Sequence, residues 1–213
     1  MTVIAIDGPA ASGKSSVARR LAEQLHCTHV NSGSLYRAAT WSILNAGINP
    51  GDEAAVTAHI LRLPISTLAS SGSLELRING EDPEPFLRDS LVNEHVSTVS
   101  SYPEVRRVLT GILRSMAENG TLVMEGRDIG SVVFPETPWK LYIDASEEVR
   151  AARRAAQGET DSIRQRDKAD QSRPSAPLVI PSGAALIDNS LLNPEETFAA
   201  VCDALASRGF QGL

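Results

Sequence analysis

The chain has 213 residues, a net charge of −6 at pH 7 and 42% hydrophobic residues, enough to bury the core of one α/β domain. The net negative charge argues against a broad nucleic-acid-binding surface, because such surfaces need clustered positive charge. The two cysteines, Cys27 and Cys202, lie far apart, which argues against a disulfide framework or a zinc site. Since the sequence shows neither a basic leader nor an apolar run of about 20 residues, we expect a cytoplasmic protein without a membrane span.

The first predicted elements are a strand, a glycine loop and a helix. Val3 to Asp7 is a short apolar run with strand character, and Lys14 to Leu25 places apolar residues at helical spacing. The loop between them reads Gly-Pro-Ala-Ala-Ser-Gly-Lys-Ser. A second strand is predicted at Thr28 to Asn31, followed by a helix from Leu35 to Ala46 that ends at Gly47.

The middle of the chain interrupts this alternation with a β-rich patch, from about 65 to 85. Within it, Leu74 to Ile78 alternates before Asn79-Gly80, a strong signal for a hairpin turn. We interpret the patch as an insert in the α/β pattern. Pro103 then opens a long amphipathic helix that ends at Asn119-Gly120.

The last part of the chain returns to strands and helices. Three further strands are predicted, at Leu122 to Met124, Leu141 to Ile143 and Ala185 to Ile187. Helices follow the latter two, starting near Ser146 and Pro194. Five strands that alternate with helices predict an α/β fold with a five-stranded parallel sheet and helices on both faces. The proline-rich loop from Gln171 to Gly183 is expected at the surface.

The glycine loop has the spacing of a phosphate-binding loop, Gly-x-x-x-x-Gly-Lys-Ser. In such a loop the glycines let the backbone wrap around phosphates, the lysine reaches the β and γ phosphates, and the serine ligates Mg²⁺. The strand before and the helix after provide the required context. The residues expected to bind the triphosphate are Gly8, Pro9, Ala10, Ala11, Ser12, Gly13, Lys14, Ser15 and Ser16, with Ser15 as the Mg²⁺ ligand.

Three classes of protein use such a loop: GTP-hydrolysing switches, motor or regulatory ATPases, and small-molecule kinases. A GTPase reads guanine through an Asn-Lys-x-Asp stretch, and none of the three lysines here follows an asparagine. ATPases have an apolar strand that ends in an acidic residue for Mg²⁺, and Leu122 to Glu125 fits that pattern, so this class is only weakened. Arginines elsewhere in the chain favour a kinase.

The arginines are placed where a second phosphate could bind. Arg37 follows "NSGSLY" and Arg127 follows "VMEG". Six more lie close together in the chain, at Arg150, Arg153, Arg154, Arg164, Arg166 and Arg173. Guanidinium groups would stabilise the charge spread over a transferring phosphoryl group. For any one of the six, a solvated helix face is an equally good interpretation, but Arg127 and Arg173 fall at a strand end and in a loop, where α/β sheets build their sites.

Five segments together carry a resemblance to a known family. They read "IAIDGPAASGKSS", "NSGSLYRA", "SYPEVRRVL", "EGRDIGSVVFP" and "RDKADQSRPSAPL". In this order they resemble the bacterial cytidylate kinases, of the P-loop nucleoside monophosphate kinase family. The resemblance implies transfer of the γ-phosphoryl group of Mg-ATP to CMP or dCMP, with no general base, in a monomer. A kinase of another small metabolite and a regulatory ATPase remain the alternatives.

The resemblance also implies the roles of individual residues. Lys14, Arg127 and Arg173 would be catalytic. The residues implied to bind CMP are Ser32, Arg37, Ser97, Arg106, Arg127, Asp128, Asp170 and Arg173. Among them, Ser97, Arg106 and Asp128 would read cytosine, and Asp170 would meet the ribose.

The family's domain plan implies a core, a small β-rich insert that binds the monophosphate, and a lid. Their expected bounds are about 1–62, 100–150 and 174–213 for the core, 63–99 for the insert and 151–173 for the lid. The sequence departs from the family's pattern in three places. "EGRD" replaces "DGRD", the run Arg166 to Asp170 lacks a second arginine, and the lid is about ten residues short by comparison of the flanking motifs. The four histidines are not expected to form a metal site.

Overall fold

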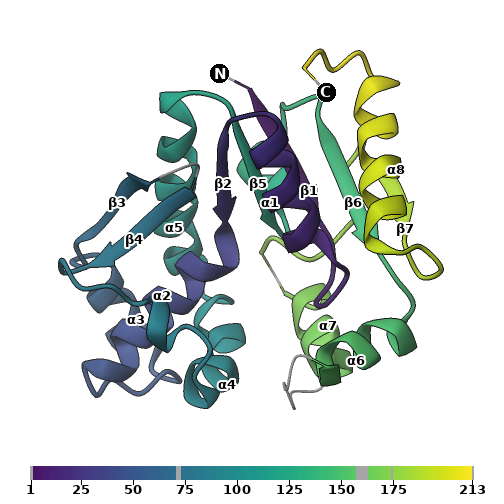
Figure 1. The fold of residues 1–213 in the computed structure, drawn as a ribbon. Coiled ribbons are helices and arrows are strands. Elements are labelled where there is room, and N and C mark those ends of the chain that lie inside the picture. Colours follow the sequence, from purple (N-terminus) through teal and green to yellow (C-terminus); the bar gives the residue numbers. More distant parts are fainter. Residues whose placement is uncertain (1, 71–72, 157–162, 174, 213) are drawn as a thin grey trace. The chain divides into compact units, whose positions relative to one another are not determined.

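The computed structural model describes residues 2–70, 73–156, 163–173 and 175–212 (Figure 1). The chain divides into two compact units. The first contains Met1–Val30 and Ala117–Leu213, and the second contains Asn31–Met116. Among the described residues, no helix combines the length and the apolar character needed to cross a membrane.

The first unit is built on a parallel sheet with the strand order β2-β5-β1-β6-β7. Its strands are β1 (Val3–Asp7), β2 (Thr28–Asn31, which leads into the second unit), β5 (Leu122–Gly126), β6 (Lys140–Asp144) and β7 (Ala185–Asp188). In the central strand, Ile6 pairs with Glu125 of β5 and with Leu141 of β6. The five-stranded parallel sheet predicted from the sequence is therefore confirmed.

Helices α1 (Lys14–Gln24) and α8 (Pro194–Ala206) pack on one face of this sheet (Figure 1). Every second residue of a strand points toward these helices, and one side of each helix points toward the sheet. The residues at these positions are apolar and form the core. Its fully buried members include Ile4, Ile6 and Leu21. Against β1 and β5 also lies a short π-helical turn, Ile129–Val133, which the sequence pattern did not predict.

Two further helices of the first unit, α6 (Glu147–Ala156) and α7 (Ile163–Gln171), flank residues 157–162. The expected lid, 151–173, therefore falls partly outside the described residues, as does the side chain of Arg166. The loop after α7 is not wholly at the surface as expected. Leu178 is buried, because an apolar side chain in a loop gains free energy by packing. Its N–H donates to the carbonyl of Asp170 at 2.9 Å.

The second unit combines helices with one antiparallel pair of strands. Its elements are α2 (Ser32–Asn45), α3 (Glu53–Ile60), β3 (Ile65–Ser70), β4 (Ser73–Ile78), α4 (Ser90–Val99) and α5 (Pro103–Met116). The unit contains the expected insert, 63–99, together with α2, α3 and α5. Helix α2 begins three residues earlier than predicted, because the Asn31 side chain caps it by accepting from the N–H of Ser34 at 3.2 Å.

Asn79 and Gly80 form a turn, but not the main hairpin turn of the β-rich patch. Both have positive φ, and the N–H and carbonyl groups of Ile78 and Glu81 exchange hydrogen bonds of 2.9 Å. Within the described residues, the pairing consists of Ile78 and Glu81 alone, because Pro83 and Pro85 have no N–H group to donate to a longer ladder. The longer pairing joins β3 to β4 across residues 71–72, which lie outside the described residues.

Each unit contains one tryptophan in contact with another aromatic ring. In the second unit, Trp41 stacks on Phe86 with ring centroids 5.3 Å apart and planes 8° apart. In the first unit, Trp139 meets Phe210 of the C-terminal tail edge-on at 5.0 Å. Such pairs add to the free energy gained from burial of the rings.

Candidate nucleotide-binding site

The phosphate loop leaves the carboxyl end of β1 and enters α1 with the backbone tightly curled. Positive φ angles occur at Gly8 (154°), Ala11 (56°) and Gly13 (90°). A side chain at Gly8 would place its Cβ atom 2.1 Å from the carbonyl oxygen of Ile143, so only glycine fits there. Gly13 is the N-cap of α1, which places the loop at the positive end of the helix dipole.

The two side chains expected to serve the triphosphate have defined partners. The Lys14 ammonium is buried and donates to the carbonyl of Pro9 in its own loop at 2.9 Å. The Ser15 hydroxyl donates to Oε2 of Glu125, at the end of β5, at 2.6 Å. Nε2 of His29, in β2, lies 3.2 Å from Oε1 of the same carboxylate. Glu125 thus stands beside the serine that is expected to ligate Mg²⁺.

The electrostatics of Glu125 favour the ionised carboxylate. Burial raises its pKa, but hydrogen bonds from His29 and Ser15 and the positive charge of Lys14 outweigh that effect, so the pKa lies below the ordinary glutamate value. An ionised carboxylate only accepts hydrogen bonds, so Ser15 donates its single hydrogen and keeps its lone pairs. Oxygen lone pairs and a nearby carboxylate are the donor set that Mg²⁺ prefers, and these residues therefore fit the ion.

A second buried carboxylate, Asp7, joins the loop to the π-helical turn. Its two oxygens accept from the N–H groups of Ile129 and Gly130, both at 2.7 Å. Burial raises the pKa of Asp7 to about 7, although the two N–H donors and Lys14 lower it and the charge of Asp128 raises it further. Sequence analysis missed this contact, because the donors are more than 120 residues away in the chain.

The expected phosphate-binding arginines of the first unit share one carboxylate. Asp170 of α7 is buried and accepts from Nε of Arg127 at 2.8 Å and from Nη2 of Arg173. Arg127 also donates to the carbonyl of Gly8 at 3.0 Å, so it contacts the phosphate loop directly. The structure therefore brings Arg127, Asp170 and Arg173 together beside the loop.

Helix α6 also contacts the phosphate loop. The buried Arg150 donates to the carbonyl of Ala10 at 3.2 Å and pairs with Asp167 of α7 at 2.6 Å. The Arg153 guanidinium donates to the side-chain oxygen of Asn189 at 3.0 Å. The Asn189 amide in turn donates to the carbonyl of Ser12 at 2.9 Å.

Neither Arg150 nor Asn189 was among the expected site residues. Arg150 lies in a helix face where a solvated arginine was an equally good interpretation. Asn189 follows the last strand, and its only signal in the sequence is a polar side chain at the carboxyl end of a parallel strand.

The expected CMP-binding residues of the second unit lie on three helices. Ser32 is buried in the first turn of α2. Arg37, further along α2, donates to Oδ1 of Asn93 at 2.6 Å and to the carbonyl of Leu87 at 3.0 Å. Arg106 of α5 is buried, donates to the carbonyl of Ser100 at 3.0 Å and lies over the ring of Tyr36 at 5.2 Å.

The remaining two expected residues are placed in different units. Ser97 is half-buried on α4 of the second unit, where its carbonyl accepts from the hydroxyl of Ser100 at 3.2 Å. Asp128 of the first unit is buried at the start of the π-helical turn, and its carbonyl accepts from the N–H groups of Val132 and Val133. The turn therefore fixes the backbone of Asp128.

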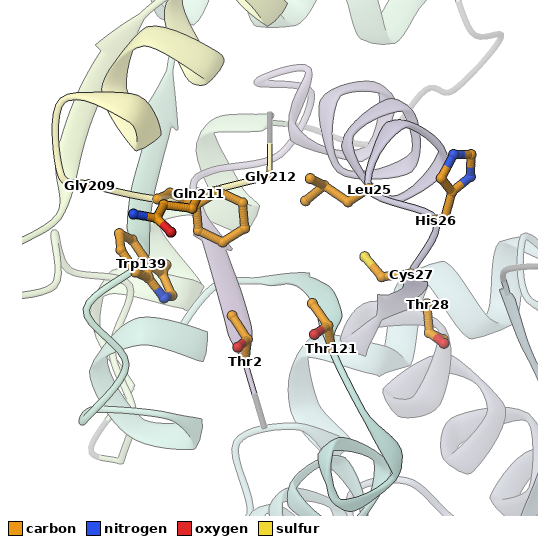
Figure 2. A pocket seen from close by; sticks show the side chains of 11 residues that line it. Thr2, Leu25, His26, Cys27, Thr28, Thr121, Trp139, Gly209, Gln211 and Gly212 are labelled. Atoms are coloured by element: carbon orange, nitrogen blue, oxygen red, sulfur yellow. The ribbon is translucent and has the colours of Figure 1, made fainter.

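A pocket of about 720 Å³ lies at the opposite end of the parallel sheet (Figure 2). Thr2, Thr121 and Trp139 line it from positions just before strands β1, β5 and β6. The C-terminal tail around Phe210 and the half-buried Cys27 also line it. Burial raises the pKa of the Cys27 thiol, which therefore stays protonated at neutral pH.

A glycine loop, a buried lysine and a serine–carboxylate pair at the carboxyl end of a parallel sheet define a P-loop nucleotide-binding protein. Residues 4–207 match the model of the family described as Cytidylate kinase. The chain belongs to the cytidylate kinase family.

Relatives with assigned names agree with this membership. The chain is 38% identical to a cytidylate kinase from Mycobacterium leprae, with 97% of this chain and 96% of the relative covered. It is also 38% identical to a cytidylate kinase from Caldanaerobacter subterraneus, with 95% and 93% covered. Among solved structures, a sugar kinase from Janibacter shares 13% identity and a TM-score of 0.50 over 97% of this chain and 95% of that one, which is a likeness of fold.

Proposed function

We propose that this chain is a nucleoside monophosphate kinase that transfers the γ-phosphoryl group of Mg-ATP to CMP or dCMP, giving CDP or dCDP. The observation that carries the proposal is the family match over residues 4–207, which includes the phosphate loop and the arginines Arg37, Arg127 and Arg173. The geometry of Lys14, Ser15 and Glu125 supports a donor site for Mg-ATP.

In this proposal, positioning and charge neutralisation provide the catalysis. Lys14 and the loop N–H groups hold the β and γ phosphates, and Ser15 is the protein ligand of Mg²⁺, which supplies charge neutralisation on the phosphates. The acceptor phosphate is bound by Ser32, Arg37, Arg127 and Arg173. No general base is needed, because that phosphate is already ionised near neutral pH.

Base selection is proposed to depend on Asp128, Arg106 and Ser97. Cytosine carries an amino group at C4 that a carboxylate can accept from, and its O2 and N3 accept from an arginine. Uracil would instead turn a carbonyl oxygen toward Asp128, leaving a buried charge without a donor. The site should therefore reject UMP much more strongly than the small difference in size between cytosine and uracil would explain.

The test is turnover of ATP by the purified protein with CMP, dCMP, UMP, AMP or GMP, measured as ADP formed. We expect rapid ADP formation with CMP and dCMP and little with the other three. Equal rates with UMP would contradict the base assignment, and no rate with CMP or dCMP would contradict the proposal itself.

Two alternatives give different results in the same assay. A regulatory ATPase would hydrolyse ATP without an acceptor and respond little to any monophosphate. A kinase of another small metabolite would be indifferent to Asp128→Ala. Asp203→Ala, at an exposed position on α8, is the matched control for that variant.

The finer expectations from the sequence belong to the same proposal. Residues 63–99 would contribute to the monophosphate site and residues 151–173 would form the lid. The enzyme would act as a monomer in the cytoplasm, where ATP and CMP are available to it. Size-exclusion chromatography with light scattering would test the monomer.

A further inference from the structure

Three polar side chains from three elements of the first unit form a continuous hydrogen-bonded chain. Ser15 of α1 donates to one oxygen of Glu125 at 2.6 Å, and His29 of β2 lies 3.2 Å from the other. Glu125 is 1% exposed, and the side chain of His29 is 13% exposed. Water therefore has little access to the carboxylate, and Ser15 and His29 each contact one of its two oxygens.

The chemistry of the three groups fixes which atoms donate. An ionised carboxylate has no hydrogen to give, so the hydrogen between Glu125 and His29 lies on Nε2 of the imidazole. The Ser15 hydroxyl likewise gives its only hydrogen to Glu125. The lone pairs of the Ser15 oxygen remain available to a cation, and the hydrogen bond to Glu125 fixes the direction of the O–H bond. His29 thus defines the serine's orientation through Glu125.

We propose that His29 is a positioning residue for magnesium-dependent nucleotide binding, acting through Glu125 to orient the Ser15 hydroxyl toward the cation. The inference rests on the proposed function, because it assumes that Ser15 ligates the Mg²⁺ of a bound nucleotide. Partners that orient a ligand in this way commonly change metal affinity by about 10- to 100-fold when they are removed.

The experiment measures ADP affinity by calorimetry in excess Mg²⁺ and again in EDTA. The ratio of the two affinities measures how much Mg²⁺ strengthens the binding of ADP to the protein, and it does not depend on turnover. His29→Leu removes the donor, whereas His29→Gln keeps an N–H donor at a similar reach. His95→Leu, on α4 of the second unit, is the matched control.

For His29→Leu we expect the magnesium-dependent gain in ADP affinity to fall about tenfold, with the affinity in EDTA unchanged. His29→Gln should restore most of the gain, and His95→Leu should match the wild type. A full gain in folded His29→Leu would overturn the proposal. So would equal losses with and without Mg²⁺, because these indicate a merely structural role.

Thermal unfolding confirms that each variant is folded, and His29→Phe, with a ring of similar size, replaces His29→Leu if that variant does not fold. The affinity ratio does not depend on which acceptor the enzyme uses. A protein that fails to phosphorylate CMP therefore contradicts the proposed function alone, and an unchanged ratio in His29→Leu contradicts the role of His29 alone.

Discussion

Gly8 is the residue of the phosphate loop that lies against the main chain of strand β6. A Cβ atom there would lie 2.1 Å from the main-chain oxygen of Ile143, and a backbone atom cannot move away as a side chain can. We expect Gly8→Ala to lower the free energy of unfolding by about 3 kcal/mol and to weaken ATP binding, as measured by urea unfolding and calorimetry.

Gly111→Ala is the control for this substitution. Gly111 lies within α5, has no atom within 4 Å of the position of its Cβ, and does not have a positive φ. Alanine there should raise the free energy of unfolding by roughly 0.5–1 kcal/mol. Similar losses in both variants would show that the close approach to Ile143 does not restrict position 8.

Asp7 predicts a pH dependence of stability. Its pKa is about 7 in the folded protein against an ordinary value of 3.8, so folding favours the protonated form. The stability that Asp7 contributes is therefore greatest below pH 3.8, declines as the pH rises toward 7 and is constant above that. Between these limits the decline approaches about 1.4 kcal/mol per pH unit.

The measurement compares urea unfolding of the wild type and Asp7→Asn from pH 4 to pH 8. The free energy of unfolding of the variant is subtracted from that of the wild type at each pH. Groups that titrate in both proteins then cancel, and the contribution of Asp7 remains because asparagine does not titrate. The difference should fall steadily up to about pH 7 and then level off. A difference independent of pH would show that Asp7 keeps an ordinary pKa in the folded protein.

At the scale of elements, α7 orients two arginines through one carboxylate. Asp170 accepts from both Arg127 and Arg173, and it is buried. In Asp170→Asn one of the two oxygens becomes an amino group that faces an arginine donor. We expect kcat/KM for CMP to fall by roughly 30-fold or more, since loss of one partner of a buried charge pair costs about 2–5 kcal/mol.

Asp203→Asn, on the exposed side of α8, should leave the kinetics unchanged. The unfolding transition of Asp170→Asn shows whether the loss is confined to activity. Unchanged kcat/KM in this variant would mean that the two arginines keep their orientation without the carboxylate.

Most elements of the parallel sheet were predictable because their signals are local. The apolar run Val3–Asp7, the glycines of the loop and the helical spacing after Lys14 lie within one short segment. The signal for a turn at Asn79-Gly80 was also local, but the pairing of β3 with β4 across residues 71–72 was not indicated by it. The π-helical turn at Ile129–Val133 depends on the carboxylate of Asp7, which no spacing in the sequence indicates.

In the candidate site, too, local features could be predicted and contacts between distant elements could not. The phosphate loop and the family's motifs could be identified from the sequence. The contacts that orient these residues could not, because they join separate elements: Ser15 with Glu125, Ser12 with Asn189, and Asp170 with two arginines. A motif shows which residue types are present, but only the fold shows which of them lie within hydrogen-bond distance of one another.

At the scale of the whole molecule, the first unit is held together by an apolar core between its sheet and two helices. Leu21 of α1 is fully buried there, packed with residues of the sheet and of α8. We expect Leu21→Ala to lower the free energy of unfolding by roughly 2–5 kcal/mol in urea titrations. Leu191→Ala, at a position 96% exposed, should change it by no more than about 0.5 kcal/mol. Equal effects would place Leu21 outside the core.

The chain has two tryptophans, and the two aromatic pairs place one in each unit. Each is therefore an intrinsic fluorophore for its own unit. With Trp139 replaced by phenylalanine, emission from Trp41 follows the second unit alone, and Trp41→Phe leaves Trp139 to report on the first. Stopped-flow recordings on these two variants can thus distinguish whether nucleotide reaches one unit before the other.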